Sequence, residues 1–396
     1  MAINDLSYAQ ISTVLGQVVA QATGTAPLAS ITSADFVAVA QTALKTGYDN
    51  VMNAISQVLS RTIFSVRPYD AKFKGLQADS IRYGNHVRKL TTIDKPFEDD
   101  DRKPLTDGST IDPWEINKPD VVQTNFYGQT VFQKSLTIFR DQLDVAFSGP
   151  EEFGRFISMV MSNASDQIEQ AHESIARMTV ANLITGKTLT DSASVIYLLD
   201  EYATQTGVTG LTSVTVKDPA NWPNFAKWLM GFLKTVSDML TERSAKFHMA
   251  TIGSSNTILR HTPLDRQKIY LFSPDLNQLD ASVLSSVFHD EYLKIADHER
   301  VNFWQGINSP MSIVAKPSYV DATGASATAA TDVALDNVLG VIFDEEAAGY
   351  TVVNQWSAPS PFNPRGGYTN MYWHFTDRYW NDFTENAVVL LLDTSN

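Results

Sequence analysis

The 396-residue sequence contains no cysteine, and this absence excludes several kinds of chemistry. Disulfide frameworks, thiolate metal sites and cysteine nucleophiles all require that residue. Basic residues are also scarce, because 30 Lys and Arg stand against 44 Asp and Glu and give a formal net charge of -14. A general nucleic-acid-binding surface needs clustered Lys and Arg, so this composition argues against one.

Long apolar runs are missing as well. No segment reaches the roughly 20 apolar residues that span a membrane, and the N-terminus lacks the pattern of a secretory signal. Hydrophobic residues still make up 43% of the chain and aromatic residues 10%, which is enough for a substantial core. We therefore expect a soluble, globular protein of two or three domains.

The sequence motifs of common enzymes are absent or incomplete. Gly186-Lys187-Thr188 resembles the end of a phosphate-binding loop, but Ala181 occupies the position where an earlier glycine is required. The seven histidines show no ligand spacing, and neither a dinucleotide fingerprint nor a nucleophile elbow is present. We predict no catalytic residue, no metal ligand and no cofactor. One alternative stays open, because a hydrolase based on two carboxylates needs no local motif.

The most prominent element is a long helix predicted from Pro150 to Thr185, with Gly186 as its stop. No proline interrupts this span, and apolar or small residues recur alternately four and three positions apart. These residues are Ile157, Met161, Ala164, Ile168, Ala171, Ile175 and Met178. The pattern predicts one apolar stripe along a strut of about 50 Å, which we interpret as architecture.

Two further helices are predicted in the first 60 residues. The first covers residues 6–22, and the second begins near Asp35, with Gly47 as a point where it divides. Their polar faces carry Ser, Thr, Gln and Asn but few charges. The helices therefore form either a mobile arm that docks on another molecule or a compact domain.

Residues 84–90 and 121–130 have the composition of two strands, and a long polar insert separates them. We interpret them as a projecting two-stranded loop whose tip contacts another chain, because a loop of this length is seldom part of a core. The acidic run at 98–101 raises the alternative of a calcium site. Its acids are consecutive and Arg102 and Lys103 follow at once, whereas an EF-hand alternates its acidic ligands. Solvated charge or a salt bridge between subunits fits better.

The second half of the chain alternates helices and strands. A helix with a strong apolar face is predicted after Asn221, and a buried strand is predicted from Phe247 to Gly253. Four C-terminal strands are predicted to form an antiparallel meander: 338–343, 350–356, 369–380 and 387–392. In the third of these strands, residues of one apolar face alternate with residues of a mixed face that includes His374.

Three short segments of this C-terminal region carry a family resemblance: Asn363-Pro364-Arg365-Gly366, Tyr372-Trp373-His374-Phe375 and Glu385-Asn386-Ala387-Val388-Val389-Leu390. The chain resembles the major capsid proteins of small tailed bacteriophages of the podophage type over roughly residues 81–392. The resemblance implies an α+β Hong Kong 97-type capsid fold and self-assembly into pentamers and hexamers. The resulting icosahedral head shell would enclose the double-stranded DNA genome, with no enzymatic site. An encapsulin-like compartment of the same fold class is the nearest alternative.

The resemblance also implies a division of the chain into parts. An extended loop follows a helical arm, the long helix lies within a peripheral domain, and an axial domain precedes the return of the chain into the peripheral sheet. The expected limits are 1–80 for the arm, 81–135 for the loop, 136–220 for the peripheral domain with its helix at about 150–185, 221–337 for the axial domain and 338–396 for the return.

Contacts between subunits are then expected at charged and aromatic residues of the loop and at one arginine near the C-terminus. The candidates are Glu98, Asp99, Asp100, Asp101, Arg102, Lys103, Trp114 and Arg365. Expected partners are other copies of the chain and the scaffolding, portal and head-decoration proteins of the same phage. The enclosed DNA would be held without sequence-specific binding, and no membrane is involved. The protein would assemble in the host cytoplasm and reside in the virion.

Overall fold

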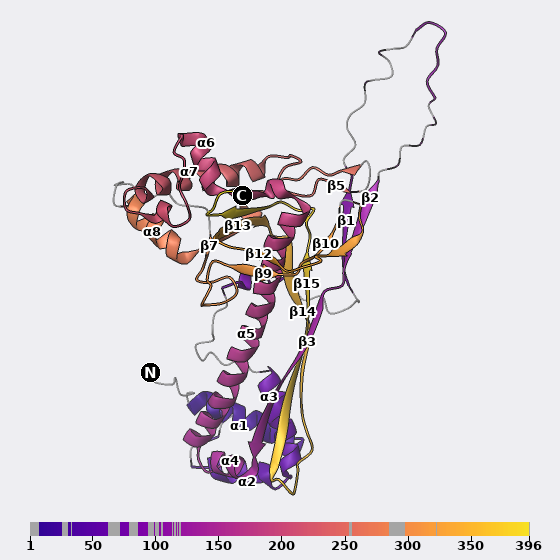
Figure 1. The fold of residues 1–396 in the computed structure, drawn as a ribbon. Helices are drawn as coiled ribbons and strands as arrows, with labels where there is room; N and C mark the ends of the chain where they lie inside the picture. The colour runs from indigo at the N-terminus through magenta and orange to yellow at the C-terminus, as the bar shows by residue number, and fades with distance from the viewer. Residues whose placement is uncertain are drawn as a thin grey trace.

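The structure is a computed structural model that shows an elongated subunit (Figure 1). A long helix, α5, runs along one side of the subunit, and the strands β3, β14 and β15 run beside it. Helices α1 to α4 gather at one end and helices α6 to α8 at the other. The described residues are 8–25, 31–32, 34–61, 72–78, 86–93, 99, 103, 106–112, 114, 116, 118, 120–252, 256–284, 298–321 and 323–395.

Helix α5 (Pro150–Thr190) confirms the predicted strut and its start, since Gly149 is the N-cap and Pro150 opens the helix. The predicted stop at Gly186 is wrong, because the helix continues to Thr190 and reaches about 60 Å. A Cβ atom built on Gly186 would lie 2.4 Å from Cε1 of Phe383. This glycine therefore makes room for an aromatic ring inside the helix and does not end it.

The apolar stripe of α5 is only partly as predicted. Ile157 and Ile175 are buried, and Ile168 is half-buried, but Met178 is 37% exposed. A straight α-helix drifts by about 20° per heptad relative to a strict seven-residue repeat, so a stripe extrapolated over three heptads leaves the buried face. The buried face continues at residues shifted around the helix, namely Ala176, Val180, Leu183 and Ile184.

The N-terminal helices pack on their own chain. Helices α1 (Tyr8–Thr23), α2 (Phe36–Leu44), α3 (Tyr48–Arg61) and α4 (Arg140–Ala146) surround the beginning of α5. Their apolar faces meet Phe153 of α5 and the inner face of β15 in one cluster, which we call the N-terminal core. The described residues of these helices thus form a compact unit with the rest of the chain. Gly47, with a positive φ of 103°, separates α2 from α3 where the division was predicted.

A three-stranded antiparallel sheet of order β14-β15-β3 lies alongside α5. Its strands are β3 (Gln129–Phe139), β14 (Ala348–Pro359) and β15 (Tyr368–Asn381). The predicted alternation in β15 is confirmed, because Met371, Trp373 and Phe375 are buried while His374 is half-buried and stacks on Trp356, with ring centroids 4.0 Å apart. Strand β3 was not predicted.

A second sheet has the order β4-β16-β13-β7-β8, so the predicted C-terminal meander is wrong. Strand β13 pairs with β16 and β7, whereas β14 and β15 leave this sheet and pair with each other and with β3. The long β14–β15 hairpin is inserted between two neighbours of the central sheet, an arrangement that hydrophobic patterns alone do not reveal. The strands are β4 (Val195–Tyr197), β7 (Gln267–Phe272), β8 (Glu299–Val301), β13 (Val338–Asp344) and β16 (Ala387–Leu391).

Both faces of the five-stranded sheet are buried. Ile269 and Leu271 of β7 face α6 (Leu198–Thr206), α7 (Trp222–Thr241) and α8 (Ser273–Leu284) in one cluster. Tyr270, between them, faces the second half of α5 in another cluster, which we call the central core. Helix α5, which we call the spine helix, therefore reaches from the N-terminal core to the central core.

The predicted buried strand from Phe247 to Gly253 is wrong. Phe247 is buried but has a φ of 71°, which interrupts an extended strand. Among residues 247–252, which the structure describes, only β5 (Thr251–Ile252) forms, and it pairs with β6 (Asn256–Thr257). Two further short antiparallel pairs complete the fold. They are β9 (Ile313–Ala315) with β12 (Val333–Leu335), and β10 (Ser318–Val320) with β11 (Ser326–Thr328).

Candidate functional site

The predicted projecting loop begins as an antiparallel hairpin of β1 (Val87–Thr92) and β2 (Val121–Phe126), which confirms its two strands. The described part of its insert lies beyond the body of the subunit (Figure 1). Trp114 is 84% exposed there and Ile116 is 78% exposed. Tryptophan is enriched at protein interfaces, so these exposed side chains make the insert a candidate contact site.

The predicted contact residues of the acidic run are only partly described. Lys103 Nζ lies 2.8 Å from Oδ1 of Asp99, and both side chains are largely exposed. These two residues therefore pair with each other within one chain. Glu98, Asp100, Asp101 and Arg102 lie outside the described residues.

The remaining predicted contact residue, Arg365, lies elsewhere, in the turn that joins β14 to β15. Its backbone N–H donates to Oδ1 of Asn363, 3.1 Å away. Asp49 of α3 accepts a hydrogen bond from the N–H of Phe362, so the turn is tied to the N-terminal helices. The predicted contact residues thus fall at two separate ends of the subunit and do not form one site.

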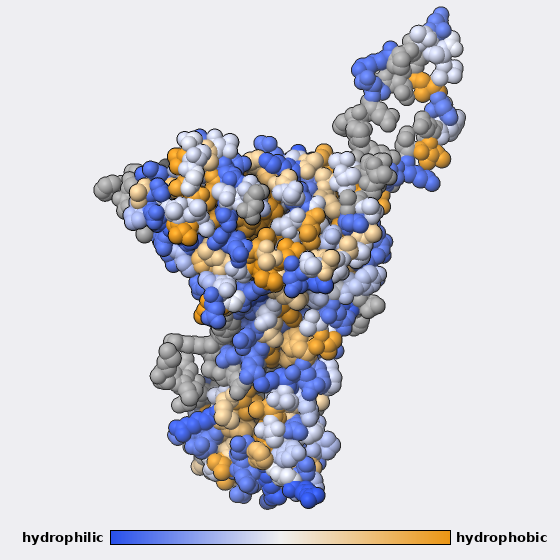
Figure 2. Space-filling model, viewed as in Figure 1, coloured by the Kyte–Doolittle hydropathy of each residue, from blue (hydrophilic) through white to orange (hydrophobic). Residues whose placement is uncertain are grey.

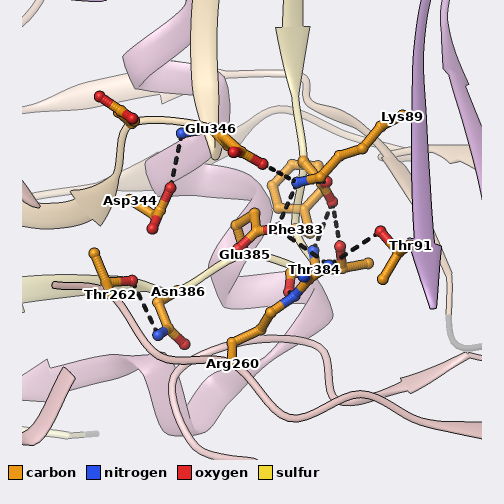
Figure 3. Close-up of polar contacts among 12 residues, drawn as sticks. Lys89, Thr91, Arg260, Thr262, Asp344, Glu346, Phe383, Thr384, Glu385 and Asn386 are labelled. Atoms are coloured by element: carbon orange, nitrogen blue, oxygen red, sulfur yellow. Dashed lines mark hydrogen bonds and ion pairs between the residues drawn. The ribbon is translucent and has the colours of Figure 1, made fainter. Parts of the chain in front are cut away.

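A cluster of charged side chains joins the base of the β1–β2 hairpin to the body (Figure 3). Lys89 Nζ of β1 lies 2.9 Å from Oδ2 of Asp382 and 3.1 Å from Oε2 of Glu346, and it also contacts Glu385. We call these four residues the hairpin clamp. Sequence reasoning did not find it, since Lys89 and Glu385 are 296 positions apart in the chain.

Arg260 adds a second link between the hairpin and the body. Its Nη2 atom lies 3.1 Å from Oε1 of Glu385 and donates a hydrogen bond of 3.2 Å to Oγ1 of Thr91. Thr91 and Lys89 lie on the same strand two positions apart, so both point to one side of β1. The hairpin is thereby fixed at two successive side chains on that side.

Burial and opposite charge compete within the clamp. Burial alone would lower the pKa of Lys89, but the charges of Asp382 and Glu385 and its hydrogen bonds to them raise that pKa above its ordinary value. Burial would likewise raise the pKa of Asp382, yet Lys89 and the hydrogen bonds from Thr384 bring it below its ordinary value. At Glu385 burial prevails, and the pKa is raised despite Lys89 and Arg260. Lys89 therefore remains charged and is held to the body by the carboxyl groups of Asp382 and Glu385.

Arg266 extends this network to the turn after β13. Its Nε atom lies 3.0 Å from Oε1 of Glu345 and its Nη2 atom 2.5 Å from Oε1 of Glu346. A polar cavity of about 450 Å³ opens between this arginine and the hairpin, with Arg243 and His261 on its wall. Within the described part of the chain, no group of three or more His, Asp or Glu could hold a metal ion.

The turn that carries Asp382 and Glu385 is also held from its other side. Lys187 of α5 is fully buried, and its Nζ donates to the main-chain oxygens of Phe247 (3.2 Å), Phe383 (3.3 Å) and Glu385 (3.0 Å). Burial lowers the pKa of Lys187 to about 8. The end of the spine helix and the base of the hairpin are therefore connected through one turn of four residues.

A second exposed apolar feature lies between α4 and α5, where a groove of about 430 Å³ is lined by Val145, Ala146, Phe156 and Met159. Val145 and Met159 are 58% and 60% exposed. Asp141, Glu152 and Arg155 also line the groove and give it charged edges. Orange side chains around the lower part of the subunit show that apolar residues reach this end of the surface (Figure 2).

Comparison with known proteins gives a consistent result. A family model described as Phi29-like phage major capsid protein matches residues 17–391. The fold is similar to a chain in the capsid structure of Staphylococcus phage Andhra, with a TM-score of 0.53 and 11% identity over 84% of this chain and 87% of that chain. It is also similar to a chain in the structure of head fiber and inner core protein gp22 of native bacteriophage P68, with a TM-score of 0.53, 10% identity and coverage of 84% and 88%. No curated protein matches. No helix among the described residues is long and apolar enough to cross a membrane.

Proposed function

The chain belongs to the Phi29-like phage major capsid protein family, and from this premise we propose that it builds its shell through contacts of the projecting hairpin. It is a major capsid protein with the Hong Kong 97-type fold, and many copies of it form the phage head shell. The comparisons give no support to an encapsulin-like compartment or to a carboxylate-based hydrolase. The arrangement of the copies as pentamers and hexamers of an icosahedral shell around double-stranded DNA belongs to the proposal.

One observation carries the proposal: charged contacts hold the base of the hairpin to the body, and the insert between its strands exposes large apolar side chains (Figure 2). The hairpin clamp and Arg260 fix β1 to the body, while Trp114 and Ile116 are exposed. Burial of an exposed tryptophan by a partner makes the free energy of binding more favourable, and aromatic residues dominate the energetics of many interfaces. A fixed base reduces the conformational entropy that such a contact would lose, because the hairpin direction is already set.

The groove between α4 and α5 is the second surface that we assign to contacts between copies. Its exposed apolar side chains, Val145 and Met159, lie at the end of the subunit opposite the hairpin. A shell subunit must touch neighbours on several sides, so contact surfaces at both ends are expected. A second copy of the chain is the occupant that fits, because the family function requires many copies side by side.

Partners other than the chain itself follow from the proposed role. Scaffolding, portal and head-decoration proteins of the same phage, assembly in the host cytoplasm and the absence of an enzymatic activity are parts of the proposal. The net charge of -14 supports a wall that holds DNA without sequence-specific binding, since few Lys and Arg are present to neutralise phosphates.

Electron microscopy of the purified full-length chain tests the proposal. We expect closed shells or ordered sheets from the wild type and their loss in a Trp114→Ala, Ile116→Ala variant, with an unchanged thermal unfolding curve. Thr110→Ala is the matched control, because Thr110 is an exposed polar residue of the same insert. Wild-type chains that stay monomeric under all assembly conditions would contradict the function. Shells from the double variant at wild-type yield would contradict only the role of the hairpin.

A further inference from the structure

The insert between β1 and β2 carries an exposed tryptophan next to a local turn. Oδ1 of Asp112 accepts a hydrogen bond of 2.9 Å from the backbone N–H of Trp114, so the backbone before the indole is tied down. Ile116 follows two positions later, and Ile111 of the same insert is also exposed. The insert therefore offers one large aromatic side chain flanked by smaller apolar ones, some of which are visible in Figure 2.

The groove between α4 and α5 has the size and the lining to receive such a side chain. Its volume of about 430 Å³ lies within the range of roughly 300–1,000 Å³ that is typical of ligand pockets. Ala146 and Phe156 are its buried apolar lining, and Val145 and Met159 are its exposed apolar lining. Alanine leaves space for a ring, and the unbranched side chain of methionine adapts its shape to a neighbour.

Charges of both signs flank both surfaces. At the groove, Arg155 pairs with Glu152 at 3.3 Å, and Asp141 lies on the same lining. The Arg155–Glu152 pair is about half exposed, and such pairs are worth only about 0 to 1 kcal/mol, so an exchange of partners costs little. On the insert, Asp112 is the charge beside the tryptophan, and Lys118 lies further along. An opposite partner is therefore available for the arginine at the groove and for the lysine of the insert.

The insert and the groove belong to different copies when they meet. Within one subunit the hairpin and helix α4 lie at opposite ends, so a chain does not reach its own groove (Figure 1). A contact between two different surfaces is repeated from each copy to the next, and it generates a closed ring or an open filament. Both exposed apolar surfaces are covered in this arrangement, with no additional partner.

Deepening the proposed function, on which this inference rests, we propose that Trp114 of one copy inserts into the α4–α5 groove of its neighbour. Asp112 then pairs with Arg155 of that neighbour, and Ile116 packs against the exposed apolar lining of the groove. Burial of an aromatic side chain removes about 150 to 250 Å² of surface from water, which makes Trp114 the main source of affinity. Each copy gives one hairpin and receives one, so the copies are linked head to tail.

Hydroxyl-radical footprinting of the wild-type chain, before and after assembly, tests the docking without any substitution. Mass spectrometry of peptides measures the oxidation of Trp114 and of Met159, which are both well exposed in the free subunit. A pocket covers about 70–90% of the surface of a bound group, so we expect the oxidation of each residue to fall by about three- to tenfold in shells. Unchanged oxidation of either residue in shells would overturn the docking.

Chemical crosslinking identifies which surface meets which, because the chain has no cysteine of its own. An Ile116→Cys, Met159→Cys variant, treated with a short bismaleimide after assembly, should give a ladder of covalent species larger than two chains on a denaturing gel. Ile116→Cys, Val214→Cys is the matched control, because Val214 is 74% exposed but does not line the groove. The control variant should give covalent dimers at most.

The outcomes separate the docking from the proposed function. Shells of the groove variant without the ladder, or the same ladder in the control variant, would overturn the docking and leave the shell function intact. Wild-type chains that form no shells and no crosslinked species would contradict both. If the cysteine substitutions prevent assembly, the footprinting of wild-type shells decides by itself.

Discussion

Lys187 and Glu385 meet through the side chain of one and the backbone of the other, with the Lys187 Nζ donating to the Glu385 main-chain oxygen at 3.0 Å. The side chain of the same Glu385 contacts Lys89 of the hairpin. One residue is therefore held by two lysines from different elements, one fully buried and one at the edge of the body. This relationship makes the hairpin direction depend on the end of the spine helix.

Replacement of Lys187 by Met should remove a gain in stability that the wild type shows as pH rises from about 8 to 10.5. The pKa of Lys187 is about 8 in the folded chain and ordinarily 10.5, so the unfolded chain binds more protons between these values. Stability from this group therefore rises with pH across that window. Chemical denaturation at pH 7 to 10.5 should show the wild type gaining stability relative to Lys187→Met. A constant difference between the two proteins would show that Lys187 does not titrate in this range.

Loss of the clamp lysine should destabilise the fold more than loss of an exposed lysine. Lys89→Met leaves the buried carboxylates of Asp382 and Glu385 without that counter-charge, and we expect a loss of about 3 kcal/mol. Lys103→Met breaks only the exposed pair with Asp99, and the expected change is within about 0.5 kcal/mol. Urea unfolding monitored by circular dichroism measures both. Equal effects of the two substitutions would show that the hairpin clamp contributes no more stability than an exposed ion pair.

A methyl group at position 186 should not fit. Gly186→Ala brings a Cβ atom to within 2.5 Å of two carbons of the Phe383 ring, and we expect a loss of about 1 to 3 kcal/mol. Phe383→Leu in the same chain should recover part of that loss. Gly231→Ala is the matched control, since this helical glycine has open space around it and alanine should stabilise α7 by roughly 0.5 to 1 kcal/mol. Similar melting temperatures for both alanine variants would contradict the predicted clash between a Cβ atom at position 186 and the Phe383 ring.

A charge in the α4–α5 groove should affect assembly but not folding. Met159 is 60% exposed, so Met159→Glu should leave the unfolding free energy within about 0.5 kcal/mol of the wild type. If a second copy covers the groove, the same change buries a charge and lowers the yield of shells in light scattering. Val214→Glu, at a site 74% exposed near the other end of the subunit, provides a comparison. Unimpaired assembly of Met159→Glu would exclude the groove as a contact.

Elements with a local sequence pattern, such as a repeat of apolar residues, could be predicted from the sequence. The apolar repeat and Pro150 at the first helical position were sufficient to predict α5, and the alternation around Trp373 was sufficient to predict β15. The predicted helix stop at Gly186 was wrong because the role of this glycine depends on Phe383, a residue nearly 200 positions away that no local pattern connects to it. Strand β3 was missed because Lys134 interrupts the apolar residues on its inner face. The clamp was missed because ion pairs between distant residues leave no periodic signal.

The parallel course of α5 and β15 has a mechanical consequence. A helix of 41 residues and a strand of 14 residues lie on opposite sides of a common core, like the two flanges of a beam. Bending in the plane of both flanges must lengthen one and shorten the other, but an extended strand has almost no length in reserve. Torsion about the long axis needs no such change, because a sheet accommodates a range of twists between its strands. We therefore expect a wall made of such subunits to twist more easily than it bends.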